Sequence, residues 1–224
     1  MSWSDFFYNN DARREKLARL GQEVLELMKN NFRATNMLSK ALNTHCGCSF
    51  QQINLNEKHT VQQNCEVLLS AIGKIQEKVQ EIDRQLKDAL EPSCYQQLRS
   101  LQTPSTGDWR KVRNILAGVI SIATAASCVA LIGLVNSGLI LSGVVLCIGG
   151  IATGALGCLV IGVLGLAIDL ILSSFIGAME RDQLEKAIQE HEEVLRDFRP
   201  ASHKYSETIM RVTVKIEMAS ESQH

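Results

Sequence analysis

The hydrophobic positions of this chain follow two different patterns. In three stretches, apolar residues recur in alternating steps of three and four, which is the spacing of a helix that buries one face. Between the second and third stretches lies a run, residues 114–168, without any Asp, Glu, Lys, Arg or His. The pattern predicts an all-α protein in which long amphipathic, coiled-coil-like helices flank a central apolar, glycine-rich helical hairpin or transmembrane segment.

The first stretch predicts a helix that starts near Asn10 or Asp11, which are both capping residues, and ends between Asn43 and Gly47. Asn31 lies among the apolar positions, and two interpretations stay open: a buried amide that fixes the register of a helix pair, or one solvated position. The seam consists of Leu17, Leu20, Val24, Leu27, Asn31, Ala34, Leu38 and Ala41.

The second stretch predicts a helix that ends at Glu91-Pro92, because the residue before a proline is pushed out of helical geometry. Its coiled-coil seam consists of Val61, Cys65, Leu68, Ile72, Ile75, Val79, Ile82 and Leu86. Residues 11–43 carry seven basic and four acidic groups, and residues 57–91 carry five and seven. These opposite charges favour an antiparallel pair of the two helices, and a parallel homodimer of the second helix is the alternative.

The third stretch keeps the same steps from Leu184 to Ile216. Pro200 lies inside it and is expected to kink or divide the helix, because proline lacks a backbone N–H. His191 is interpreted as a packed or partly solvated core residue, with pH sensing as the alternative. Residues 181–224 carry seven basic and nine acidic groups, so this helix too is suited to pack beside the first.

The uncharged run is long enough to cross a bilayer once or, as a hairpin, twice, since one crossing needs about 20 apolar residues. Turn-forming residues between Gly133 and Gly138 favour the hairpin. Small residues spaced four apart predict a helix face that another helix can approach closely. These residues are Gly150, Gly154, Cys158 and Gly162.

An aromatic residue and three cations precede the run and predict a membrane-interface site: Trp109, Arg110, Lys111 and Arg113. Clustered Lys and Arg mark the cytosolic side, so we expect the N-terminal arm in the cytosol. The expected parts are a helical hairpin or coiled-coil arm (1–103), a linker with the basic flank (104–113), a membrane segment of one or two helices (114–179) and a C-terminal helix kinked near Pro200 (180–224).

Candidate chemistry adds little to this picture. The seven cysteines are an odd number, and the start of the chain has no secretory signal pattern, so we expect free thiols in the reducing cytosol. The spacing of His45, Cys46, Cys48, His59 and Cys65 fits no common zinc pattern, which predicts no metal site. No phosphate-binding loop, H-E-x-x-H motif or nucleophile elbow occurs. We therefore expect no enzyme, no cofactor, no small-molecule substrate and no nucleic acid.

Three groups of residues resemble the single-pass membrane and coiled-coil domain-containing proteins. They are Thr35–Cys48, Asn64–Gln76 with Leu86–Pro92, and Val163–Ile171 with Ala201–Tyr205. The resemblance implies a membrane-anchored coiled-coil protein without enzymatic activity and supplies no catalytic residues. The chain departs from the family pattern in a central run long enough for two crossings and in Pro200 within the last helix.

These observations predict a non-enzymatic, membrane-anchored coiled-coil protein that acts as a scaffold at the cytosolic face of a membrane. Its expected partners are the lipid bilayer and other helices, through self-association or in partner proteins. The alternative is a membrane-perforating or remodelling protein, whose charged helices mask the apolar hairpin until a trigger exposes it.

Overall fold

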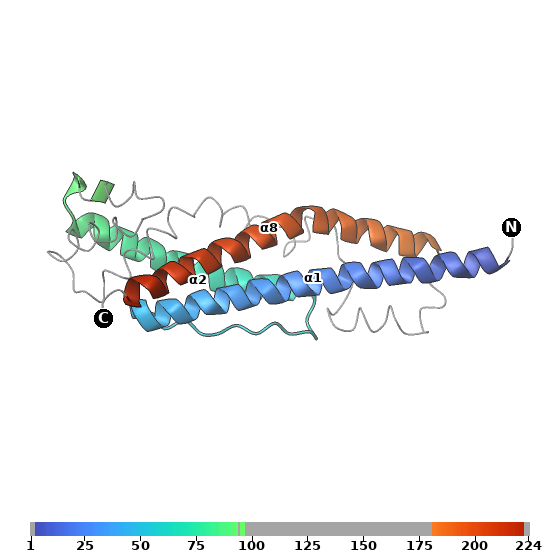
Figure 1. The fold of residues 1–224 in the computed structure, drawn as a ribbon, viewed down its shortest axis with the longest axis horizontal. Helices are drawn as coiled ribbons and strands as arrows, with labels where there is room; N and C mark the ends of the chain where they lie inside the picture. The colour runs from blue at the N-terminus through green and yellow to red at the C-terminus, as the bar shows by residue number, and fades with distance from the viewer. Residues whose placement is uncertain (1–2, 94, 97–180, 222–224) are drawn as a thin grey trace. The chain divides into compact units, whose positions relative to one another are not determined.

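The structure is a computed structural model that describes residues 3–93, 95–96 and 181–221, and α-helix dominates these ranges (Figure 1). Three long helices are α1 (Trp3–Cys46), α2 (Val61–Ala89) and α8 (Arg181–Glu221), and the described ranges contain no β-strand. The all-α prediction is therefore confirmed for them. None of the helices in these ranges is both long enough and apolar enough to cross a bilayer. The uncharged run lies outside the described residues.

The chain divides into two compact units, and each of the three helices contributes residues to both. The first unit contains Met1–Phe32, Asn54–Leu69 and Gly143–Lys204. The second unit contains Arg33–Ile53, Ser70–Ser142 and Tyr205–His224. The contacts described below each lie within one of these units.

Helix α1 starts at Trp3, well before the predicted start near Asn10 or Asp11, so that prediction was wrong. Side chains that cap helices oppose helix formation only weakly, and a helix can continue through them. The predicted end is confirmed, because α1 ends at Cys46. Gly47 follows with a φ of 62°, a left-handed conformation that glycine adopts without strain, and the Cys48 N–H donates to the Leu42 carbonyl at 3.4 Å.

The apolar seam of α1 is buried along its whole length, from Leu17 to Ala41. Asn31 is fully buried with it, which excludes the solvated interpretation of this residue. Residues beside the seam, including Met28, Phe32 and Leu42, are buried as well. The buried stripe is therefore wider than the narrow seam of a two-stranded coiled coil and is typical of a helix in a globular bundle.

Helix α2 starts with a reciprocal cap. The Gln63 N–H donates to Thr60 Oγ1 at 3.1 Å, and the Thr60 N–H donates to Gln63 Oε1 at 2.9 Å. This arrangement satisfies two backbone donors that a helix start otherwise leaves unpaired. The helix ends at Ala89, just before Glu91-Pro92, as predicted from the proline.

The connection between α1 and α2, residues 47–60, returns along α1 instead of forming a tight helical turn. In the second unit, Phe50 binds Asn43 of α1, and Ile53, three residues further on, binds Asn36 of the same helix. In the first unit, Glu57 Oε1 lies 3.2 Å from Lys29 Nζ, so the connection passes Lys29 shortly before α2 begins. The connection thus runs antiparallel to α1 beside Asn36 and Asn43, and the predicted antiparallel pairing of the two helices stays a prediction. Charge balance favoured that pairing, but it contains no information about direction.

Helix α8 continues to Glu221 with Pro200 inside it, so the proline does not divide the helix. In the first unit, α8 lies beside α1 and runs in the same direction, because residue numbers increase together along their contacts (Figure 1). The prediction that the C-terminal helix packs beside the first is confirmed. The three heptad-like stretches thus correspond to three helices, two of which meet directly.

Candidate interaction site

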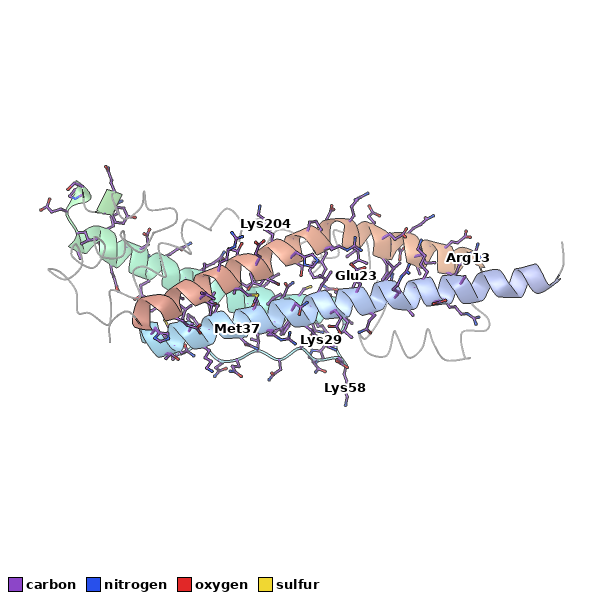
Figure 2. All side chains as sticks on the ribbon, viewed as in Figure 1. Arg13, Glu23, Lys29, Met37, Lys58 and Lys204 are labelled. Atoms are coloured by element: carbon purple, nitrogen blue, oxygen red, sulfur yellow. The ribbon has the colours of Figure 1, made fainter. Side chains whose placement is uncertain are left out.

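Ion pairs join α1 to α8 in the described part of the first unit, and three of them define the register. Arg13 Nη2 lies 2.7 Å from Glu185 Oε1, and Lys16 Nζ lies 2.7 Å from Glu192 Oε1. The third pair reverses the signs: Arg199 donates to both carboxylate oxygens of Glu23, with a distance of 2.8 Å from Nη2 to Oε2. Figure 2 labels Arg13 and Glu23 on α1. The charges of the two helices therefore match in one parallel register.

The pair of Glu23 and Arg199 lies at the protein surface. The hydrogen bond from Arg199 lowers the pKa of Glu23, and partial burial opposes this shift. The carboxylate therefore stays ionised at neutral pH. Because both partners are well exposed to water, screening keeps their effect on stability small, and the fork of two hydrogen bonds mainly fixes orientation.

Neutral polar side chains meet in the buried part of the same contact. In the first unit, Ser202 Oγ donates to Oδ1 of the fully buried Asn31 at 2.9 Å. In the second unit, the hydroxyl groups of Thr35 and Tyr205 share a hydrogen bond of 2.6 Å. Burial raises the pKa of Tyr205, so its phenol stays protonated. Because a buried polar group without a partner costs free energy, these pairs penalise any shift of α8 along α1.

His191 is a packed core residue, as interpreted from the sequence, with 3% of its surface exposed. Its Nδ1–H donates to the carbonyl of Ala187 in the same helix at 2.7 Å, since a carbonyl oxygen only accepts. Burial lowers the pKa of His191. The ring is therefore neutral at pH 7. The alternative interpretation, that His191 senses pH, stays a hypothesis.

A second contact of α1, here named the asparagine clasp, consists of Asn36 and Asn43 bound to the backbone of Ile53 and Phe50. Asn36 Nδ2 donates to the Ile53 carbonyl at 2.7 Å, and the Ile53 N–H donates to Asn36 Oδ1 at 2.9 Å. Asn43 binds Phe50 in the same two-way manner, at 2.8 and 2.7 Å. Each side-chain amide thus makes the two hydrogen bonds that an extended segment normally makes to a neighbouring strand.

The spacing of the clasp has a geometric reason. Asn36 and Asn43 lie seven residues apart, on one helix face, with a rise of about 10.5 Å. Phe50 and Ile53 lie three residues apart, and an extended chain covers about 10 Å in three steps. The two repeats therefore match, and the segment runs straight along the helix.

A third asparagine holds the same connection in the first unit. The fully buried Asn64 of α2 accepts the Asn56 N–H at Oδ1 and donates from Nδ2 to the carbonyls of Asn56 and Thr60, each at 3.0 Å. The connection is therefore an ordered part of the fold, held by side-chain hydrogen bonds at three asparagines. Apolar periodicity does not reveal it, but the seven-residue spacing of Asn36 and Asn43 was an available signal.

The structure describes part of the sequence-predicted sites. Five members of the α2 seam are buried: Val61, Cys65, Leu68, Ile72 and Ile75. The side chains of Val79, Ile82 and Leu86 lie outside the described part of the structure. The predicted interface residues Trp109, Arg110, Lys111 and Arg113 lie outside the described residues. So do the predicted packing residues Gly150, Gly154, Cys158 and Gly162.

The described ranges contain no group of three or more His, Cys, Asp or Glu side chains that are close enough to hold a metal ion. Burial raises the pKa of Cys48, which keeps this thiol protonated at neutral pH. Cys65 is fully buried in the core. The geometry of the α1–α8 contact and of the clasp is suited to holding helices in place.

Comparison with protein families identifies one to which the chain is similar. The family model described as "Protein of unknown function (DUF4533)" matches residues 13–174, which include most of α1, all of α2 and the uncharged run. No solved structure matches the chain.

Proposed function

The chain belongs to the DUF4533 family of proteins of unknown function, and we propose that it is a non-enzymatic, membrane-anchored helical scaffold. Residues 114–168 form the anchor, and α1, α2 and α8 form the part that binds other helices or partner proteins at the cytosolic membrane face. One observation carries the proposal: helices from both sides of the uncharged run pack directly against each other.

The charge distribution supports the anchor. All 47 acidic and basic side chains lie outside residues 114–168, and the ion pairs between α1 and α8 use several of them. A charged side chain at the centre of a membrane helix costs about 2.5 to 3.5 kcal/mol on insertion scales. A run without any such residue is suited to lipid, and the charged helices are suited to water.

The polar contacts favour a scaffold over the masked hairpin. A mask requires the helix seams to cover the apolar run. At the seam positions with defined partners, however, α1 and α8 bind each other: Asn31 pairs with Ser202, and Thr35 beside the seam pairs with Tyr205. These pairs support a preformed helical body that leaves the run to the bilayer.

The proposal assigns no chemical role to Cys48, Tyr205 or His191. Cys48 and Tyr205 both have a raised pKa, and the Nδ1 proton of His191 binds the carbonyl of its own helix. None of these three groups is activated as a nucleophile or a base at neutral pH.

Alkaline carbonate extraction of membranes from cells that express the full-length chain tests the anchor. We expect the protein in the membrane pellet. The matched control carries Ile120→Arg and Leu159→Arg, which place charges in the run, and we expect this variant in the supernatant. Wild-type protein in the supernatant would contradict the anchor, and dye release from liposomes would then test the masked-hairpin alternative.

A further inference from the structure

We infer that α1 and α8 face the same aqueous compartment, so that the uncharged run enters and leaves the membrane through one face. The inference rests on the proposed membrane anchor. It goes beyond that proposal because an anchor alone is equally compatible with one crossing, which would place α8 on the opposite side.

The evidence is the continuity of the α1–α8 contact. In the first unit, contacts extend from Arg13 with Glu185 to Asn31 with Ser202, a span of 18 residues of α1 and 17 residues of α8. Because each helix advances about 1.5 Å per residue, nearly equal spans mean that the two helices keep one parallel register over this length. The contact is therefore an extended surface between segments that precede and follow the run.

A single crossing is incompatible with this surface. The hydrocarbon core of a bilayer is about 30 Å thick, whereas the paired atoms of α1 and α8 lie within about 3 Å of each other. With α8 on the far side, every one of these pairs would be lost, and the fully buried Asn31 would lose its partner Ser202. The run must therefore cross an even number of times.

The length of the uncharged run is sufficient for two crossings. Two crossings need about 40 apolar residues and four need about 80, so a run from residue 114 to residue 168 is sufficient only for two. The flanking cations agree with this topology. Arg110, Lys111 and Arg113 precede the run, and Arg181 and Lys186 follow it, so both ends carry the residues that stay in the cytosol.

Epitope tags at both ends of the full-length chain test the topology. Cells are permeabilised at the plasma membrane only, and antibodies then probe each tag before and after detergent opens the internal membranes. We expect equal accessibility of the two tags before detergent. One accessible and one protected tag, with the protein in the carbonate pellet, would overturn the shared compartment and leave the anchor intact. Protein in the carbonate supernatant would overturn both proposals.

A cross-link tests the contact in the membrane itself. In membranes after carbonate extraction, Glu23→Cys with Arg199→Cys should join the two helices through a short bismaleimide, detected as linked peptides by mass spectrometry. The matched control is Glu15→Cys with Arg199→Cys, which moves the first thiol about 12 Å along α1. We expect linked peptides only for the first pair. Equal yields for both pairs, or no linkage in the membrane fraction, would overturn the inference.

Discussion

The α1–α8 contact and the asparagine clasp use the same helix in different ways. Toward α8, the side chains of α1 meet other side chains, as Asn31 meets Ser202. Toward the connection, they meet backbone groups, as Asn36 meets Ile53. The first contact depends on the residue types of both partners, whereas the hydrogen bonds of the clasp depend only on the asparagines. A sequence pattern therefore reveals the first more readily than the second.

The largest expected effect is in the buried part of the α1–α8 contact. Tyr205 is 1% exposed, and Tyr205→Ala removes a core aromatic ring together with the partner of Thr35. We expect the free energy of unfolding to fall by about 3 to 5 kcal/mol, measured by denaturant titration of the full-length chain in mild detergent. The control on the same helix is Met210→Ala, at a half-exposed position, which should change it by less than about 0.5 kcal/mol. Similar effects of the two variants would contradict a packed Tyr205.

The clasp should show a smaller effect. Asn36→Ala and Asn43→Ala each leave a backbone donor and acceptor of the connection without the asparagine, and we expect a loss of about 1 to 3 kcal/mol for each. Amide hydrogen exchange at Ile53 and Phe50 should become faster in the corresponding variant. Unchanged exchange would show that the asparagines do not hold the segment.

Asn36→Asp separates hydrogen bonding from shape in the clasp. It keeps the oxygen that accepts from the Ile53 N–H but replaces the donor with a second oxygen opposite the Ile53 carbonyl. We therefore expect destabilisation at pH 7 despite the nearly equal volume of the side chain. Ile53→Val, which keeps the backbone groups, is the matched control. A loss for Ile53→Val as large as that for Asn36→Asp would contradict the dominance of backbone hydrogen bonds.

A pH effect should appear at His191 alone among the seam positions. Its pKa is below 6.5 in the folded protein, so the unfolded chain binds more protons between that lowered pKa and pH 6.5. The stability contribution is therefore complete above pH 6.5 and is lost as the pH falls. We expect Tm to decrease less between pH 7 and pH 5 in His191→Gln than in the wild type. Equal slopes for the variant and the wild type would contradict this titration.

The smallest effect is expected at the surface pair of Glu23 and Arg199. Glu23 has a folded pKa below 4.5, so its contribution is present above pH 4.5 and is lost as the pH falls through the lowered value. Glu23→Gln should leave Tm at pH 7 nearly unchanged and abolish only this acid-side loss, as measured by thermal unfolding at pH 3 to 7. A large decrease of Tm at pH 7 would contradict a screened surface pair.

The sequence predicted the contacts that depend on apolar periodicity. The buried seam of α1, the end of α2 before Pro92 and the packing of α8 beside α1 all follow from hydrophobic spacing, proline geometry and charge. The direction of a helix pair cannot be predicted in this way, because opposite net charges stabilise parallel and antiparallel pairs alike. The helix start was also misplaced, since Asn10 and Asp11 are as compatible with a helix interior as with its first turn.

The clasp was missed for a different physical reason. Burial of apolar surface is periodic, so it can be detected along a sequence. A hydrogen bond from a side chain to a distant backbone group cannot, because almost any residue type has the backbone donor and acceptor that it needs. Only Asn36 and Asn43 carry information about it. Asparagines seven residues apart on a predicted helix, followed by a glycine and a polar segment, are therefore a pattern to test for helix-bound extended chains.

The parallel arrangement of α1 and α8 also sets an order of events during synthesis. Asn31 and Ser202 are 171 residues apart, and a ribosome needs roughly 10 to 30 s to add that many residues. The clasp and the first turns of α2 become available within the next few dozen residues after α1. The uncharged run then emerges before any of α8 exists, so α1 and α8 can meet only after that run has been made. The α1 groups that pair with α8, such as Asn31, therefore meet these partners only after most of the chain has been made.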